Sequence, residues 1–112
     1  MEILKTKINK EHLKLNYAGV FKTMVKGVAD IKNEIIALDA EMHADLETLL
    51  IEEGSAQEDL WGFNLYFERE SGEFIEYTSL INIRPHQNNK SMEICNEEIK
   101  NMVKKTVMRW IG

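Results

Sequence analysis

The stretch Leu60-Trp61-Gly62-Phe63-Asn64-Leu65-Tyr66-Phe67-Glu68 decides the fold, because large apolar residues occupy every second position in it. Side chains of an extended strand point alternately to its two faces. One face therefore carries Trp61, Phe63, Leu65 and Phe67, and the other carries Gly62, Asn64 and Tyr66. The stretch predicts a strand with one face in the protein core.

The segment after this strand predicts its hairpin partner. Residues 69–72 end in Gly72 and form the loop, and a similar alternation then runs from Glu73 to Arg84. Pro85 ends the second strand, because proline has no N–H to donate to a sheet.

The segment before the strand allows two assignments. Residues 28–38 are rich in β-branched side chains and predict a strand, after which Asp39-Ala40 turns the chain. Residues 41–51 then return as the next strand, with a core face of Met42, Ala44, Leu46 and Leu50. The spacing of Met42, Leu46, Leu49 and Leu50 also fits a helix, so residues 28–50 are either a hairpin or partly helical.

Both ends of the chain predict amphipathic helices. Asn9 can cap a helix that begins at Lys10 and ends between Thr23 and Gly27, and Asn96 can cap the last helix. Residues 2–8 fit a short edge strand. The predicted fold is α+β, with one domain over residues 1–112: an antiparallel four-stranded meander sheet with the N- and C-terminal helices packed on one face and the other face polar and free.

Charge and cysteine content narrow the classes of partner. A net charge of -5 at pH 7 disfavours a general binder of nucleic acid or acidic membranes, which needs clustered cations. The single cysteine, Cys95, excludes an intrachain disulfide and favours a reducing compartment. No apolar run is long enough for a transmembrane helix, and the N-terminus lacks an apolar signal core. We therefore expect a cytoplasmic protein with no nucleic-acid or membrane partner.

The acidic run Glu41-Met42-His43-Ala44-Asp45-Leu46-Glu47 gives the first candidate site. In the predicted hairpin, Glu34 lies opposite Asp45 on the face that also carries His43. Like charges directly opposite destabilise a strand pair, and a divalent cation with imidazole and carboxylate ligands would relieve them. The alternative is a solvated sheet face. The candidate cofactor is therefore a divalent metal ion, with Glu34, His43, Asp45 and Glu47 as its candidate ligands, and the solvated face remains the competing interpretation.

A second candidate site lies around the end of the second predicted strand. Arg84 sits there beside a loop rich in asparagine and serine, a composition that suits a phosphate or carboxylate ligand. The alternative is a polar loop whose amides satisfy turns. The predicted anion- or ligand-binding residues are Asn64, Tyr66, Asn82, Arg84, Asn89 and Ser91.

Three groups of residues carry a family resemblance: His43-Ala44-Asp45-Leu46-Glu47; Glu53-Gly54-Ser55 with Gln57-Glu58-Asp59-Leu60-Trp61-Gly62 and Asn64-Leu65-Tyr66; and Ile81-Asn82-Ile83-Arg84-Pro85 with Asn89 and Ser91. Together they resemble a family of small prokaryotic proteins described only as a domain of unknown function. The resemblance spans nearly the whole chain. It implies a self-contained domain and carries no assigned site.

Two functional hypotheses follow. The chain has no glycine-rich phosphate loop and no recognisable nucleophile–base set. We therefore expect a non-enzymatic module that self-associates, for example as a homodimer, or binds another protein. The competing hypothesis is a metal-dependent hydrolase or lyase that uses His43, Asp45 and Glu47, with Arg84 and Asn82 orienting an anionic substrate.

Overall fold

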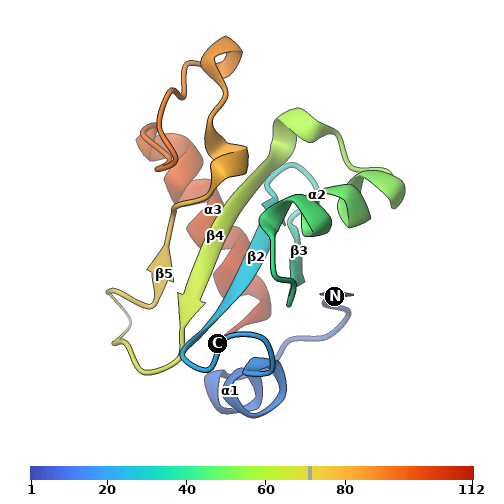
Figure 1. The fold of residues 1–112 in the computed structure, drawn as a ribbon, viewed down its shortest axis with the longest axis vertical. Coiled ribbons are helices and arrows are strands. Elements are labelled where there is room, and N and C mark those ends of the chain that lie inside the picture. Colours follow the sequence, from blue (N-terminus) through green and yellow to red (C-terminus); the bar gives the residue numbers. More distant parts are fainter. Residues whose placement is uncertain (71) are drawn as a thin grey trace.

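The computed structural model describes residues 1–70 and 72–112, and these form an antiparallel sheet with helices on both faces (Figure 1). The described strands are β1 (Glu2–Ile3), β2 (Met24–Asp30), β3 (Ile35–Leu38), β4 (Leu60–Tyr66) and β5 (Ile75–Glu76). The α-helices are α1 (Lys10–Tyr17), α2 (His43–Glu52) and α3 (Glu97–Trp110). The α+β class is confirmed. The sheet order is β1-β3-β2-β4-β5, so the predicted four-stranded meander is wrong in its connections.

Strand β4 forms where the alternating pattern predicts it. Its side chains Trp61, Phe63 and Leu65 are fully buried in the larger core cluster. The strand pairs along its whole length with β2, with Val28 opposite Gly62 and Met24 opposite Tyr66. Because β2 and β4 pair over seven residues, they are the centre of the sheet, and the shorter strands lie outside them.

The turn before β3 lies eight residues earlier along the chain than predicted. Residues 31–34, rather than Asp39-Ala40, connect two paired strands. The Asp30 carboxylate accepts hydrogen bonds from the backbone N–H groups of Lys32 (3.0 Å) and Asn33 (2.9 Å), and Glu34 adopts a left-handed conformation with φ 54°. The predicted continuous strand over residues 28–38 is therefore wrong, because Asp30 satisfies the amides of a tight turn in its middle.

Residues 43–52 form helix α2, so the predicted second strand over residues 41–51 is wrong and the helical alternative is correct. Buried residues recur at helical spacing, at His43, Leu46 and Leu50. Leu46 and Leu50 pack in a smaller core cluster with Val28 and Leu60. Helix α2 thus covers part of the sheet face that the sequence predicted to be free.

Helices α1 and α3 pack together on the other face, as predicted, and Figure 1 shows α3 and α2 on opposite sides of the sheet. The predicted caps are confirmed: Asn9 accepts from the His12 N–H at 2.7 Å, and Asn96 accepts from the Ile99 N–H at 3.0 Å. Helix α1 ends at Tyr17, earlier than predicted, and the chain enters the sheet at Met24. None of the described helices is long and apolar enough to cross a membrane.

The predicted long strand over residues 73–84 is reduced to the two residues of β5. The chain then forms short 3-10 helices at Leu80–Asn82 and Pro85–Gln87. Ser79 starts the first of them, because its hydroxyl oxygen accepts from the Ile81 N–H at 3.2 Å. In the alternation predicted over residues 73–84, Ile83 shares the apolar face with Ile75 and Ile81, but in the structure it is 43% exposed.

Candidate functional site

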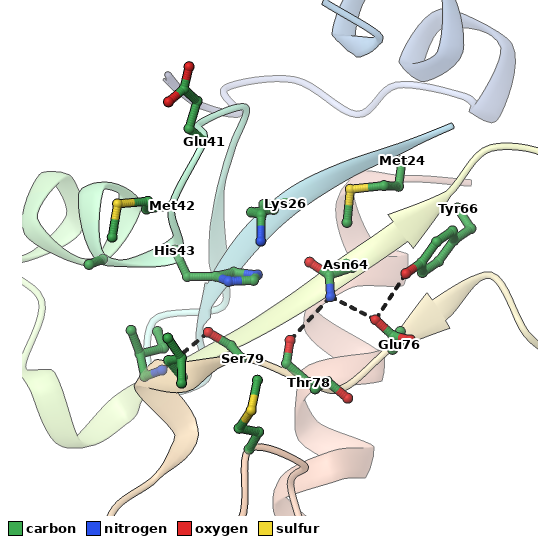
Figure 2. Close-up of a pocket in the computed structure, with 14 residues that line it drawn as sticks. Met24, Lys26, Glu41, Met42, His43, Asn64, Tyr66, Glu76, Thr78 and Ser79 are labelled. Carbon is green, nitrogen blue, oxygen red and sulfur yellow. Dashed lines mark hydrogen bonds between the residues drawn. The ribbon is translucent and has the colours of Figure 1, made fainter. Parts of the chain in front are cut away.

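A pocket of about 460 Å³ opens beside α2 on the second face of the sheet (Figure 2). Its floor is a row of three side chains from neighbouring strands. Lys26 of β2 is paired with Asn64 of β4, and Asn64 is paired with Glu76 of β5. Directly paired residues of a sheet project from the same face, so an ammonium, an amide and a carboxylate lie side by side.

The walls of the pocket are mainly apolar. They include Met24 and the three exposed residues Met42, Leu80 and Met92, which are 57%, 68% and 40% exposed. An apolar lining with a few fixed polar groups is the usual composition of a ligand pocket. Methionine side chains are unbranched and adapt to the shape of an occupant.

The orientation of the Asn64 amide is fixed by its neighbours. Its Nδ2 donates to the Glu76 carboxylate at 2.8 Å and to the Thr78 carbonyl at 3.2 Å. Both neighbours are acceptors, so the amide nitrogen rather than the oxygen faces them. The Asn64 Oδ1 atom lies on the other side of the amide, facing Lys26 and His43 in Figure 2. It is buried and makes no hydrogen bond among the described residues, and the neighbouring His43 ring could donate to it only when protonated.

His43 adds a neutral imidazole to the pocket. His43 is 7% exposed, and its Nε2 lies 2.9 Å from the backbone carbonyl of Phe63, which only accepts hydrogen bonds. Burial lowers the pKa of His43, with a further contribution from the Lys26 charge, and this outweighs the opposite effects of Phe63, Asn64 and Glu76. The ring is thus neutral at pH 7, with the proton on Nε2 and a lone pair on Nδ1.

Tyr66 completes the polar side of the pocket. Its hydroxyl donates to the same Glu76 oxygen as Asn64, at 3.1 Å, and burial together with the Glu76 carboxylate raises the pKa of Tyr66. Among the described residues, the charged side chains at the pocket are Lys26 and Glu76 on its floor and Glu41 at its edge, where Figure 2 shows the carboxylate pointing away from Asn64. In the described part of the chain no hydrogen bond joins Ser79 to His43, so these two residues do not form a nucleophile–base pair.

The four predicted metal ligands do not come together. Glu34 lies in the β2–β3 turn near Lys105 (3.9 Å) and Arg109 (3.4 Å), while His43 lies in the pocket. Asp45 is exposed on α2, and Glu47 pairs with Arg84 at 3.1 Å. Among residues 1–70 and 72–112, no group of three His, Cys, Asp or Glu residues is arranged to hold a metal ion. The predicted hairpin that aligned them is wrong, because residues 43–52 are helical.

The six predicted ligand-binding residues divide into two groups. Asn64 and Tyr66 line the pocket, and the other four lie in or beside the 3-10 segments. Asn82 bonds the backbone of Gly62 twice, accepting from its N–H at 2.8 Å and donating to its carbonyl at 3.0 Å. A Cβ at Gly62 would lie 2.5 Å from the Cβ of Ser79, so this close approach requires glycine.

Asn89 and Ser91 organise the loop that follows. Asn89 Nδ2 donates to the carbonyls of Asn82, Ser91 and Glu93, and its Oδ1 accepts from the Cys95 N–H at 2.9 Å. The Ser91 hydroxyl oxygen accepts from the Glu93 N–H at 3.1 Å. These polar groups hold the loop in place.

Arg84 is also occupied by the protein itself. Its guanidinium donates to the carbonyls of Ile81 and Gln57 and to Glu47, and it lies 4.8 Å from the centre of the Trp61 ring. Burial lowers the pKa of Arg84, and the Glu47 carboxylate opposes that shift. Only 5% of its side chain is exposed, so Arg84 joins α2 to the 3-10 segments and presents little surface to an anion.

Sequence reasoning missed the pocket residues Lys26, Glu76 and Met24. The signal that would have found them is strand register: the pairing of β2 with β4 places Lys26 and Met24 beside Asn64 and Tyr66, and the pairing of β5 with β4 places Glu76 beside Asn64. The register requires β2 to begin at Met24, inside the segment where the sequence predicted the end of a helix.

The fold and this site define a class: an α+β domain with helices on both faces of an antiparallel sheet and a mainly apolar pocket beside α2. Residues 2–110 match the family described as "Protein of unknown function (DUF5674)", and the chain belongs to this family. No curated protein and no solved structure matches the chain.

Proposed function

We propose that this domain is a non-enzymatic binding module and that the pocket beside α2 receives a side chain or short segment of a partner protein. The observation that carries the proposal is the combination of an apolar pocket with an exposed apolar rim. Met42, Leu80 and Met92 are all at least 40% exposed and lie around one opening. Clustered exposed apolar side chains around a cavity are typical of interaction surfaces, whereas single ones are ordinary.

A protein partner suits the rim better than a small ligand alone does. A small ligand inside the pocket leaves the outward-facing parts of Leu80 and Met42 in water, whereas a protein surface around the inserted group covers them. Flexible methionines at such a rim allow contact with a partner of uneven shape. The four predicted metal ligands lie apart in the structure, so the metal-dependent enzyme hypothesis lacks a site of the kind that the pocket offers to a protein partner.

The test compares two exposed leucines on different sides of the molecule. A photo-crosslinking residue is placed at Leu80, which is 68% exposed at the pocket, or at Leu15, which is 75% exposed on α1. We expect irradiation of producing cells to give a discrete adduct from position 80 and none from position 15. The purified partner should then bind Leu15→Asp like the unaltered protein and lose at least tenfold in affinity for Leu80→Asp.

The mass of the adduct identifies the kind of partner. An adduct of twice the chain mass, with a dimer in sedimentation, assigns the pocket to self-association, and any other discrete mass assigns it to a different protein. Equal crosslinking from positions 80 and 15, or none from either, would contradict the proposal.

A further inference from the structure

We propose that the group which enters the pocket is a neutral carboxamide on an apolar body, an inference that rests on the proposed binding function of this pocket. The side chain of glutamine and the backbone peptide group both have this chemistry. The row Lys26–Asn64–Glu76 on the pocket floor, and the charges in that row, support a neutral amide ligand.

The pocket floor lacks a hydrogen-bond donor at one defined atom. Asn64 is only 5% exposed, and its Oδ1 atom is buried without a hydrogen-bond partner. It has no alternative orientation, because a flipped amide would point its oxygen at the Glu76 carboxylate and the Thr78 carbonyl. Buried polar groups in native proteins are nearly always paired, so an unpaired acceptor at the floor of a pocket indicates a donor on the ligand.

A donor of hydrogen bonds to the ligand stands next to this acceptor. Lys26 is the direct neighbour of Asn64 in the sheet, and Figure 2 shows its ammonium on the same side as the Asn64 oxygen. The Lys26 Nζ lies 5.5 Å from the centre of the Phe21 ring. A carboxamide has an N–H for Asn64 and a carbonyl for Lys26, so one small group satisfies both.

The charges around the floor disfavour the alternatives to a neutral group. A carboxylate has no proton for Asn64 and meets the like charge of Glu76 on the floor. An alkylammonium has the proton but meets the like charge of Lys26. A neutral amide avoids both repulsions.

Access to the Asn64 oxygen requires flexible side chains to move. Met24 and Lys26 flank it in Figure 2, and both are unbranched chains with several rotatable bonds. Displacement of Met24 lets the thioether stay in contact with the apolar body of the ligand. The walls formed by Met42 and Met92 supply the remaining apolar contact.

The test titrates the purified chain, labelled at its methionine methyl groups, with five probes of one length: hexanamide, N-methylhexanamide, methyl hexanoate, hexanoate and hexylammonium. NMR shifts of the methionine methyls give each dissociation constant. We expect at least one of the amides to bind about tenfold more tightly than the ester, as one added hydrogen bond to a buried acceptor implies. Preference for hexanamide assigns a glutamine-like side chain, and preference for N-methylhexanamide assigns a peptide group.

Variants tie the preference to the proposed atoms. The amide-to-ester ratio should fall to about one in Asn64→Leu, and to an intermediate value in Lys26→Met, which keeps the length of the side chain. It should be unchanged in Asn101→Leu, an exposed position on α3. If Asn64→Leu does not fold, the amide-to-ester ratio of Lys26→Met alone tests the inference, and an unchanged ratio in that variant overturns it.

The failures of the two proposals are distinguishable. Equal binding of ester and amides would overturn the carboxamide inference and leave an apolar binding pocket. Tightest binding of hexanoate or hexylammonium would overturn it in favour of a charged ligand. Absence of binding by every probe overturns the carboxamide inference, whereas the crosslinking experiment tests the protein-binding proposal independently.

Discussion

The buried asparagines of the pocket floor and of the 3-10 segments differ in how far their hydrogen bonds are satisfied. Asn82 and Asn89 use both the oxygen and the nitrogen of their amides within the chain. Asn64 uses only its nitrogen, and its oxygen has no partner among the described residues. One residue type, buried to a similar degree, thus has two different roles in this protein.

The difference separates residues that hold the fold from those available to a ligand. A polar side chain whose donors and acceptors are all used has nothing left to offer a partner, however polar it looks in the sequence. Arg84, Asn82, Asn89 and Ser91 use their polar groups within the chain, and we assign them to the architecture. Asn64 and Tyr66 remain in the pocket.

Arg84→Met tests the architectural group with the largest expected effect. The substitution removes a buried guanidinium and leaves Glu47, whose side chain is 14% exposed, without its partner. Loss of one member of a buried ion pair destabilises a protein by about 3–5 kcal/mol. We expect urea denaturation to show a loss of this size in the free energy of unfolding. The paired variant Arg84→Met with Glu47→Leu should recover part of it, and a loss below about 1 kcal/mol would show that Arg84 is free to bind.

The second prediction compares the same substitution in the two groups. Asn82→Leu leaves the N–H and carbonyl of Gly62 and the Met92 carbonyl without this partner, and each unsatisfied buried group costs about 1–3 kcal/mol. Asn64→Leu loses two hydrogen bonds but also removes an unpaired acceptor. We expect Asn82→Leu to lower the free energy of unfolding by about 3 kcal/mol and Asn64→Leu by about 1 kcal/mol, measured in urea. Equal losses would remove the distinction between the groups.

The parts of the fold that the sequence predicts correctly depend on local patterns. Alternation in β4 and the caps Asn9 and Asn96 are each visible within a few residues, and all three are confirmed. The α+β fold class and the placement of the two terminal helices on one face of the sheet follow from these local patterns. Local pattern is reliable there because the same short segment that carries the signal also forms the element.

The errors in the predicted fold arise where a contact between residues distant in the sequence determines the local structure. In the turn after Asp30, Ser55 donates to the carboxylate at 2.6 Å and Trp110 donates to the carbonyl of Glu34 at 2.8 Å. Neither contact is visible in residues 28–38 alone. After this turn, residues 43–52 form a helix and not the returning strand of the predicted hairpin, so the side chains of residues 41–47 do not alternate between two faces. The candidate metal site was lost by the same error.

The smallest expected effect concerns the protonation of His43 in the pocket. Burial, reinforced by Lys26, lowers the pKa of the folded-state ring, while in the unfolded chain it has an ordinary value near 6.5. Below pH 6.5 the unfolded state therefore binds more protons than the folded state, so the free energy of unfolding falls as the pH falls. His43→Gln keeps an N–H for the Phe63 carbonyl without a titrating ring.

We expect unfolding in urea at several pH values between 7.5 and 5.5 to show a steeper loss of stability for the unaltered protein than for His43→Gln. Identical slopes would show that the ring is not held neutral. The effect stays small because Asn64 and Glu76 favour the protonated ring and oppose the effect of burial. Protonation also places a proton near the buried Asn64 oxygen, which has no hydrogen-bond partner among the described residues. Acid therefore weakens the fold while it supplies part of the hydrogen bonding that we assign to the ligand, so the amide-to-ester preference should be larger at pH 7.5 than at pH 5.5.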